Sequence, residues 1–418
     1  MKKSRAALMG LLSATLAFPL GAVSQPAHAA SSTSFTLNAA VLDGGQQVTS
    51  ITLETTRYRI NPKGLSVNTF QVRAKGTNPF AELGSAVLGT YDQYRTVTGV
   101  SLNSDGDVVI ELLSGPDAPA ASTLGYAYAA DAATKMAGRN VQLDLEYTLT
   151  QRQPLRAAGR PLTFSSFTQG AVVDPEVDDY STGTSDSGLN YRLFIPREAK
   201  KSNRRPLIVW LHGAGEGGWS AAQDSALPLL GNRGALGFST PKAQRIFGGA
   251  YVVAPQATDF WMNDPAMGYS AKLKSLLDEL VAQYPVDADR IYVVGASNGG
   301  YQTLALETRY PKYFAAAVPI CPPLKLGDTD LVPDAQLLAA RRTPTWIVQA
   351  KNDPVVPFES NGQHASDVIG NAHLTAYPDV VWDGTTYNGH WSWIYVAHND
   401  PQLPNGKHLF QWMARQHR

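Results

Sequence analysis

The chain of 418 residues carries 35 lysines and arginines and 35 aspartates and glutamates, so its formal net charge is zero. This balance provides no electrostatic footprint for nucleic acid or for an anionic membrane surface, and we expect neither as a partner. The single cysteine, Cys321, excludes an intramolecular disulfide, and we interpret it as a buried structural residue because no basic residue lies directly beside it to activate the thiol.

The first thirty residues have the layout of a secretion signal. Basic residues among the first five precede the uncharged apolar stretch 6–23, and the small-residue sequence Ala-His-Ala at 27–29 follows as a cleavage site. A membrane anchor is the alternative, but the apolar stretch is short, contains Pro19 and leads into the cleavage sequence. We therefore expect cleavage near Ala29 and a secreted protein, extracellular or periplasmic, without a membrane anchor. About 390 residues then remain, roughly twice the usual size of one domain, which predicts two domains.

Between residues 31 and 150 the sequence predicts an all-β sandwich of immunoglobulin-like size. Short segments there alternate β-branched or aromatic residues with polar ones at period two, and turn residues separate them. The expected strands are 48–53, 66–72, 95–102, 108–113 and 141–149, with a hairpin turn at 103–107. None of these residues has a spacing typical of a catalytic site, so the sequence leaves the role of this domain open.

The remainder of the chain has a different pattern. Residues 151–188 are rich in Pro, Ser, Thr, Gly and Asp and are interpreted as the connection between the two domains. From 189 to 418, apolar strands alternate with helical segments, which predicts a mostly parallel sheet flanked by helices. The expected strands are 189–195, 207–211, 250–254, 291–295, 315–320, 345–350 and 374–377. The best defined helix lies before the strand at 291, where apolar residues from Leu273 to Val281 share one face.

The pentapeptide Gly-Ala-Ser-Asn-Gly at 295–299 matches the G-x-S-x-G pattern of a nucleophile elbow. The buried strand 291–295 leads into it and a helical segment from 301 follows, which is the strand-turn-helix arrangement that an elbow requires. Glycines flank the serine because such a sharp turn brings neighbouring backbones too close for Cβ atoms. We therefore predict Ser297 as the nucleophile of an α/β-hydrolase domain, with a Gly/Ser-rich turn without chemistry as the alternative.

A serine hydroxyl needs a base within hydrogen-bond distance. In this kind of fold the base is a histidine that follows both the nucleophile and the acid in the chain. His390 is the candidate, since it lies in a glycine-bearing loop after the last expected strand and can reach over the elbow. His398 is the second candidate for the same role.

The base in turn needs a carboxylate that orients it. Asp353 directly follows the strand 345–350, so we expect it at the carboxyl edge of the sheet, on the same side as the elbow. A turn-forming role before Pro354 is the alternative for this residue. Asp328, Asp330 and Asp334, in the loop after the preceding strand, are less well placed candidates for the acid.

The oxyanion of a tetrahedral intermediate requires preorganised N–H donors. The backbone N–H of Asn298, directly after the nucleophile, is one candidate. The second is expected in the loop after strand 207–211, where Ala214 is the first choice and Gly215 the next. His212 opens this loop and is interpreted as a structural histidine rather than as a second base.

Five sequence motifs carry a resemblance to a known family. They are Leu-His-Gly-Ala-Gly-Glu-Gly-Gly at 211–218, Val-Asp-Ala-Asp-Arg-Ile-Tyr at 286–292, the elbow, Asp-Pro-Val-Val-Pro at 353–357 and Gly-His at 389–390. Together they resemble bacterial α/β-hydrolase esterases of the prolyl-oligopeptidase-like and polyhydroxybutyrate-depolymerase-like branch, in particular arylesterases with an N-terminal immunoglobulin-like domain. The resemblance implies hydrolysis of short-chain acyl or aryl esters by a triad of Ser297, Asp353 and His390. It also implies a small-molecule or polymeric ester as substrate and no metal or organic cofactor.

Two other functions fit the same triad. One is a serine peptidase of the prolyl-oligopeptidase type, although no repeated β-propeller blade precedes the hydrolase part. The other is a polyester depolymerase, acting on a polyhydroxyalkanoate-like polymer that the sandwich binds.

Aromatic residues near the expected site are candidates for substrate contact. Trp261 is the first choice, and Trp391 stands next to His390. Glu216 is interpreted as a structural residue that bonds within its own loop. The segment between 320 and 345 is short, which predicts an open site without a large lid.

Overall fold

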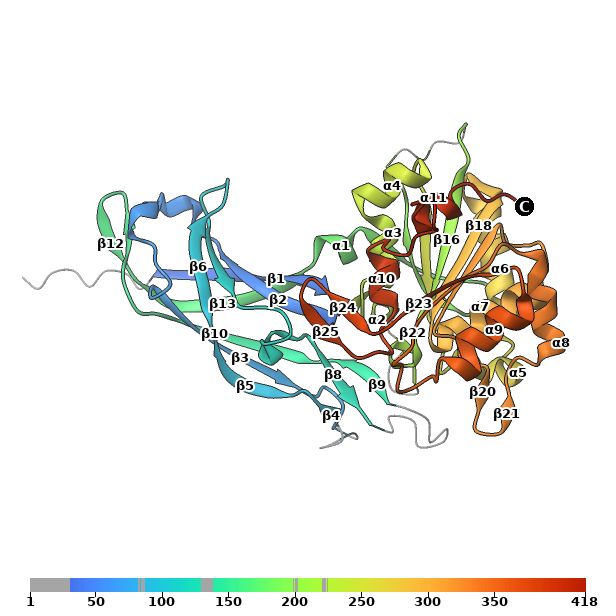
Figure 1. The fold of residues 1–418 in the computed structure, drawn as a ribbon. Coiled ribbons are helices and arrows are strands. Elements are labelled where there is room, and N and C mark those ends of the chain that lie inside the picture. The colour runs from blue at the N-terminus through green and yellow to red at the C-terminus, as the bar shows by residue number, and fades with distance from the viewer. Residues whose placement is uncertain are drawn as a thin grey trace, which may run out of the picture.

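The computed structural model describes residues 31–81, 83, 87–128, 138–197, 199, 202–219, 223 and 225–418. The expected secretion signal at 1–30 and its cleavage site lie outside these residues. The described chain forms an all-β N-terminal part, followed by a C-terminal part in which helices cover a large sheet (Figure 1). None of the described helices has both the length and the apolar character needed to cross a membrane.

The N-terminal part contains two β-sheets that pack face to face. The larger has the strand order β13-β1-β2-β7-β6 and the smaller β10-β3-β5. Their strands are β1 (Ser31–Leu42), β2 (Gly45–Leu53), β3 (Phe70–Thr77), β5 (Tyr91–Arg95), β6 (Val97–Leu102), β7 (Val108–Leu112), β10 (Asp144–Gln151) and β13 (Phe164–Val173). Phe35 and Ile51 of the larger sheet share one buried core with Val72 and Leu149 of the smaller. Alternate residues of these strands face this core, as the period-two pattern predicts.

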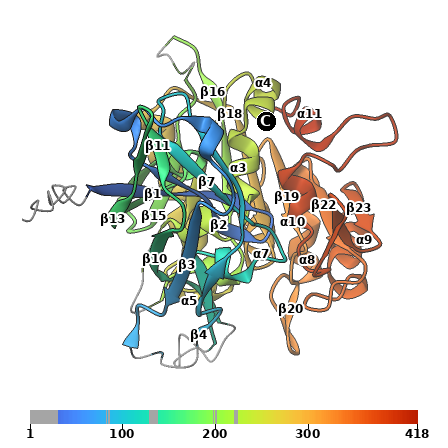
Figure 2. The ribbon, with the colours of Figure 1, turned by 90° about the vertical axis from the view of Figure 1, so that its left-hand side faces the viewer.

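A third small sheet faces the C-terminal part. It has the order β4-β8-β9, with β4 (Val87–Leu88), β8 (Leu124–Ala127) and β9 (Arg139–Gln142). Figure 1 shows β8 and β9 at the end of the N-terminal part that lies nearest the large sheet, and Figure 2 views the molecule from the side of the N-terminal strands.

Two of the expected N-terminal strands are each divided between different sheets. The segment predicted as 95–102 comprises the end of β5 and the whole of β6, and the segment predicted as 141–149 comprises the end of β9 and most of β10. Arg95, at the first of these switches, is buried and donates to the Tyr147 hydroxyl at 2.8 Å. Period-two alternation continues across such a switch, so the pattern predicts strand residues but not their hydrogen-bond partners. The strand predicted to begin at 66 begins at Phe70, after a turn.

The prediction that 151–188 merely connects two domains is wrong. This range contains a hairpin of β11 (Leu155–Ala157) and β12 (Arg160–Leu162), followed by β13, which pairs in parallel with β1. After the short helix α1 (Pro175–Asp178), β14 (Tyr180–Thr184) is already the first strand of the large sheet. Most residues of β13 are partly or fully exposed, so this edge strand lacks the apolar alternation by which a strand is detected in a sequence.

The large sheet of the C-terminal part has eight strands in the order β14-β15-β17-β16-β18-β19-β22-β23. They are β14, β15 (Asn190–Phe194), β16 (Arg205–Leu211), β17 (Tyr251–Pro255), β18 (Val286–Ala296), β19 (Ala316–Ile320), β22 (Trp346–Ala350) and β23 (His373–Tyr377). β15 is antiparallel to both of its neighbours, and the pairs from β17 to β23 are parallel. The expected strands from 189 onward all match strands of this sheet. The inner strands β16, β17, β19 and β22 are almost entirely buried, and such strands are continuous apolar runs in the sequence.

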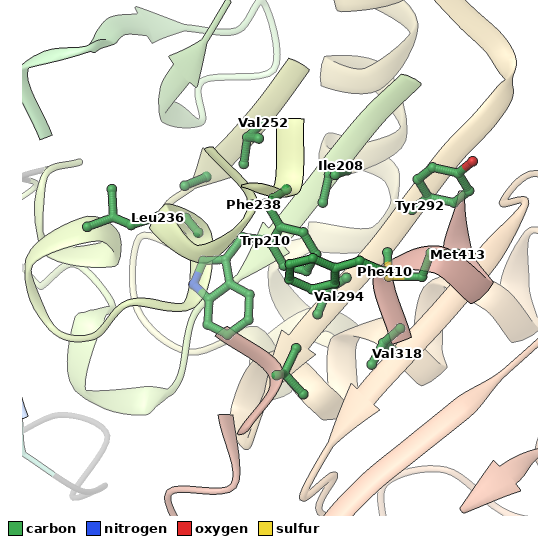
Figure 3. Close-up of a cluster of buried hydrophobic side chains, with 14 of the residues drawn as sticks. Ile208, Trp210, Leu236, Phe238, Val252, Tyr292, Val294, Val318, Phe410 and Met413 are labelled. Atoms are coloured by element: carbon green, nitrogen blue, oxygen red, sulfur yellow. The ribbon is translucent and has the colours of Figure 1, made fainter. Parts of the chain in front are cut away.

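Helices cover both faces of this sheet. They are α2 (Leu227–Leu230), α3 (Gly234–Ser239), α4 (Pro241–Phe247), α5 (Asp264–Met267), α6 (Tyr269–Gln283), α7 (Asn298–Arg309), α8 (Asp334–Leu337), α9 (His364–Ile369), α10 (Trp393–Ala397) and α11 (Leu409–Met413). Ile208 and Trp210 of β16 point to one face, where they pack with Phe238 and Phe410 (Figure 3). Leu207, Val209 and Leu211 point to the other face and pack with residues of α6 and α7. The two cores hold the carboxyl ends of the parallel strands in place.

Glu307 of α7 is a carboxyl group without exposed surface in the second of these cores. The Thr345 hydroxyl lies 2.8 Å from Glu307 Oε2 and 2.9 Å from the Thr343 carbonyl oxygen, but it has only one hydrogen to donate. Both contacts are hydrogen bonds only when Glu307 is protonated and itself donates to the Thr345 oxygen. Burial raises the pKa of Glu307 to about 8, against a smaller lowering by the Thr345 hydroxyl.

Replacing Glu307 with glutamine is expected to stabilise the protein at pH 8–9 and to have little effect at pH 5. The folded state keeps its proton up to a pKa of about 8, whereas the unfolded chain releases it above the ordinary 4.5, so the parent loses stability as pH rises between these values. The loss is about 1.4 kcal/mol per pH unit of separation. Urea unfolding of E307Q and parent at several pH values measures it, with the exposed Glu359→Gln as control. A stability difference independent of pH would contradict the assignment.

Candidate active site

Ser297 lies at a strained turn between β18 and α7. Its φ angle is 54°, in the left-handed region that a non-glycine residue occupies only when the surroundings enforce it. The N–H of Ser297 donates to the Ile320 carbonyl oxygen at 2.9 Å, which holds the turn against the neighbouring strand β19. A Cβ on Gly299 would overlap the Leu211 carbonyl oxygen, so the close approach of the two backbones requires glycine there. This is the geometry that the strand-turn-helix pattern predicts.

A line of hydrogen bonds joins Ser297, His390 and Asp353. His390 Nε2 lies 2.9 Å from Ser297 Oγ. The other ring nitrogen, Nδ1, lies 2.9 Å from Asp353 Oδ2 and 3.0 Å from Oδ1. A ring that donates from Nδ1 to the carboxylate has a free lone pair on Nε2, which accepts from the serine hydroxyl. The three residues therefore meet in the order hydroxyl, imidazole, carboxylate that the sequence predicts.

The Asp353 carboxylate is held by its own turn. Oδ1 accepts the N–H groups of Val355 and Val356, each at 2.9 Å, and the side chain is fully buried. Burial alone would raise the pKa of Asp353, but the hydrogen bond from His390 and the two backbone donors outweigh it and keep that pKa below its ordinary value. Asp353 is therefore ionised at any pH near neutrality.

Cys321 lies directly beside this group, a contact that the sequence does not indicate. It is buried, as expected, and its Sγ lies 3.4 Å from the His390 carbonyl oxygen. Burial alone lowers the pKa of His390, but the Cys321 side chain and the Asp353 carboxylate raise it, and the pKa ends above its ordinary value. Among the described residues, Cys321, Asp353 and His390 form a group that could hold a metal ion, since their ligand atoms lie within 4.8 Å of one another. In this structure His390 Nδ1 and the Asp353 carboxylate are hydrogen-bonded to each other instead.

Replacing Cys321 with alanine is expected to move the acidic limb of the kcat/KM pH profile to lower pH, by about one unit or less. The reason is that Cys321 raises the pKa of His390, and only the neutral imidazole accepts the serine proton. The measurement is the pH dependence of ester hydrolysis between pH 5 and pH 10. An unchanged acidic limb would show that the sulfur has no electrostatic effect on the ring.

The expected oxyanion donors lie around Ser297. The N–H of Asn298 is the first of α7, where helix geometry leaves it without an intrahelical acceptor. Ala214 and Gly215 line the same cleft as Ser297, in the short 3₁₀ turn Ala214–Glu216. His212, just before this turn, has both ring nitrogens in backbone contacts: Nδ1 with Gly213 O at 2.6 Å, and Nε2 accepting the Ala257 N–H at 3.0 Å. Burial lowers the pKa of His212 to about 3, which fits the expected structural role.

Ser297 and His390 line a cleft of about 520 Å³ between the two parts of the molecule. From the C-terminal part, the cleft is lined by the turn at Ala214–Glu216 and by Trp391 and Trp393. From the N-terminal part its lining includes Asp43, Gly44, Leu88, Ser122, Leu124, Tyr126 and Asn140. These residues lie far from Ser297 in the sequence and have no local pattern of their own, so sequence reasoning missed them.

The structure separates the two tryptophans expected to contact substrate. Trp391 lines the cleft and lies 6.0 Å from Trp393, ring centre to ring centre. Trp261, in contrast, has no exposed surface and packs against His212 and Tyr269 in the core. The prediction that Trp261 contacts substrate is wrong, because its ring packs into the buried core that includes Tyr269 and Leu273 and does not line the cleft.

The alternative base and acid lie elsewhere. His398 pairs with Asp43 of the N-terminal part at 2.8 Å and stacks on Trp382. Asp334 pairs with His364 at 2.7 Å on the surface, and Asp328 and Asp330 are exposed. None of them contacts Ser297 or His390.

Several known proteins are similar to this chain. The sequence pattern of the prolyl oligopeptidase family matches residues 272–374. Feruloyl esterase B of Neurospora crassa is 28% identical over 142 residues, which cover 32% of this chain and 45% of that protein. Poly(3-hydroxyalkanoate) depolymerase C of Paucimonas lemoignei is 28% identical over 185 residues, which cover 41% of this chain and 40% of that protein. The chain thus spans less than half the length of these curated relatives.

One solved structure is similar over both parts of the molecule. It is described as a thermostable esterase, is 26% identical, and superposes with a TM-score of 0.73 over 92% of this chain and 99% of its own. The matched family segment contains Ser297 and Asp353. These similarities confirm the resemblance to esterases that the motifs indicate. The mostly parallel sheet flanked by helices and these similarities show that the C-terminal part of this chain has the α/β-hydrolase fold.

Proposed function

We propose that this protein is a serine carboxylesterase that hydrolyses short-chain acyl or aryl esters through an acyl-enzyme. The observation that carries the proposal is the line of hydrogen bonds from Ser297 through His390 to Asp353, open to a cleft. The names of the relatives support an ester as the bond attacked.

In the first half of the reaction, Ser297 Oγ attacks the ester carbonyl carbon while His390 Nε2 takes its proton. The charge that forms on the carbonyl oxygen is stabilised by the N–H of Asn298 and by an N–H of the Ala214–Glu216 turn. Asp353 holds the ring with Nδ1 as donor and stabilises the positive charge that the ring acquires. The protonated His390 then gives its proton to the leaving alcohol, and the acyl group remains on Ser297.

In the second half, a water molecule replaces the alcohol. His390 Nε2 takes a proton from the water as its oxygen attacks the acyl carbon, and returns that proton to Ser297 Oγ as the acid leaves. The same N–H donors stabilise the second oxyanion. The chain's own residues thus supply every proton transfer.

The cleft supports a small acyl group as the substrate. Its volume of about 520 Å³ lies within the lower half of the range for small-ligand pockets. Leu88, Leu124 and the two tryptophans provide apolar surface next to Ser297.

A polymeric ester is a second candidate, favoured by a neighbouring hollow. This hollow, of about 770 Å³, shares Asp43, Gly44, Ser122 and Trp391 with the cleft. Its other walls include Trp382 and Tyr387, both on the hairpin of β24 (Val380–Trp382) and β25 (Thr385–Tyr387), which lies between the two parts in Figure 1. A long substrate bound at Ser297 has room to continue into this hollow.

Three substrate classes distinguish the candidates. We expect p-nitrophenyl acetate and butyrate to be hydrolysed with higher kcat/KM than longer esters, and a fluorophosphonate to label Ser297. Comparable kcat/KM for proline-containing peptide amides would instead support a peptidase, and release of hydroxy acids from an insoluble polyester would support a depolymerase. If the protein hydrolyses none of these esters, the proposal is refuted.

We also propose that the protein is exported and that its N-terminal β part is immunoglobulin-like. The layout of residues 1–30 supports export, and the face-to-face packing of two sheets supports the second proposal. Expression in a bacterial host tests export: a secreted chain that begins just after Ala29, as read by mass spectrometry, is the expected result, and retention of the full-length chain in the cytoplasm would contradict it.

A further inference from the structure

Glu216 is a buried carboxyl group in the wall of the cleft for which ester hydrolysis assigns no role. It is 7% exposed and ends the 3₁₀ turn Ala214–Glu216, from which an oxyanion donor is expected. Burial raises the pKa of Glu216 to about 7, against the lowering by nearby N–H groups and by the buried Arg139, so the group is costly to place there. A buried acid at such a place needs a physical explanation.

The contacts of Glu216 hold the turn together from inside. The N–H groups of Glu216 and Gly213, the Arg139 guanidinium and the Asn232 side chain all favour the ionised form and lower the pKa of this carboxyl group. The Glu216 backbone carbonyl oxygen accepts the Gln256 side-chain amide at 2.9 Å. Among the described residues, the N–H groups of Ala214 and Gly215 donate no backbone bond. The Glu216 carboxyl group therefore lies beside the backbone of Gly213, while the N–H groups of Ala214 and Gly215 remain for the oxyanion.

The second set of contacts comes from the N-terminal part. Asn140, on β9, donates from Nδ2 to Glu216 Oε1 at 3.2 Å. The same amide lies against Gly215, where an added Cβ would stand 3.3 Å from Asn140 Nδ2. Asn140 also lines the cleft. One side chain of the N-terminal part thus touches both the carboxylate and the backbone of the turn.

We propose that Glu216 is a positioning residue for the oxyanion donors and that Asn140 couples it to the N-terminal β part. In this arrangement the N-terminal part sets the geometry of the loop that stabilises the tetrahedral intermediate. The inference rests on the proposed esterase function, because the oxyanion arises in that reaction. Loss of either side chain displaces the donors without removing Ser297, His390 or Asp353.

Kinetic constants separate this role from a merely structural one. We expect kcat for p-nitrophenyl butyrate to fall about 100-fold in E216A and about 10-fold in N140A, with KM changed by less than about twofold. An alkyl trifluoromethyl ketone provides the second readout. Ser297 Oγ adds to its carbonyl carbon, the proton goes to His390, and the carbonyl oxygen becomes an oxyanion. Its inhibition constant should rise in the same proportion as kcat/KM falls.

Matched variants control for folding and charge. The single variant Asn140→Asp places two acids side by side. The double variant E216Q/N140D restores the pair with the amide and the acid exchanged. We expect the double variant to recover kcat to within about threefold of the parent. Gln142→Ala, an exposed residue of the same strand outside the cleft, should leave kcat unchanged. Rates are referred to the concentration of active sites, so that partial unfolding does not count as loss of kcat.

Three results would overturn the inference. They are unchanged kcat in both E216A and N140A, a rise in KM without a fall in kcat, and inhibition by the ketone that does not follow kcat/KM. A parent enzyme without activity on any ester would instead refute the proposed function, so the two failures are distinguishable.

Discussion

Replacing Ser297 with alanine is expected to lower kcat for p-nitrophenyl acetate by about 10⁴- to 10⁶-fold. Without Oγ no acyl-enzyme forms, and the reaction falls back on direct attack by water in the same cleft. The remaining N–H donors and the bound geometry still stabilise the oxyanion, so a residual rate about 10³-fold or more above that in water should persist. KM should change little, because the Ser297 side chain contributes little to substrate binding.

The control for this variant is Ser360→Ala. Ser360 is exposed and lies outside the cleft; its hydroxyl donates to the Pro357 carbonyl oxygen at 3.5 Å and accepts from Asn361 Nδ2 at 3.1 Å. It should keep full activity and full labelling by a fluorophosphonate, whereas S297A should lose both. Parent-like hydrolysis by S297A would exclude Ser297 as the nucleophile and leave the elbow without a chemical role.

Replacing Asp353 with asparagine is expected to lower kcat by about 10⁴-fold near neutral pH. The amide oxygen can keep the N–H groups of Val355 and Val356, which orients the NH₂ group towards His390 Nδ1. Nδ1 must then accept, so the ring carries its hydrogen on Nε2 and cannot take the serine proton. The shape of the site is retained while the tautomer is wrong.

The pH profile of D353N provides a second test. Since the Asp353 carboxylate raises the pKa of His390, its removal lowers that pKa, and the acidic limb of the residual activity should shift to lower pH. Asp328→Asn, in the exposed loop that offered the alternative acids, should leave both rate and profile unchanged. A large loss in D328N together with an active D353N would transfer the role of the acid to that loop.

The residues that the sequence predicts as catalytic do lie close together in the structure. They could be found from the sequence because each stands in a strong local pattern. Ser297 stands in a strand-turn-helix, Asp353 directly follows a buried strand, and His390 lies in a glycine-bearing loop. The carboxyl ends of parallel strands share one edge of a sheet, so residues that follow such strands are predicted to lie near one another. The same reasoning predicts that Trp261 contacts substrate, but its side chain is buried. Position after a strand does not determine the direction in which a side chain points.

The sequence by itself determined the strands of the large sheet from β15 onward, the elbow and the chain order of Ser297, Asp353 and His390, because apolar runs and glycine spacing are local properties. The tertiary structure alone decided which strands pair, that β13 and β14 occupy the expected connection, and that Cys321 lies beside His390. It also decided that Asn140 reaches Glu216 and that N-terminal residues line the cleft. These are contacts between segments distant in the chain, which form because buried surface and hydrogen bonds must be satisfied together, and no local pattern records them.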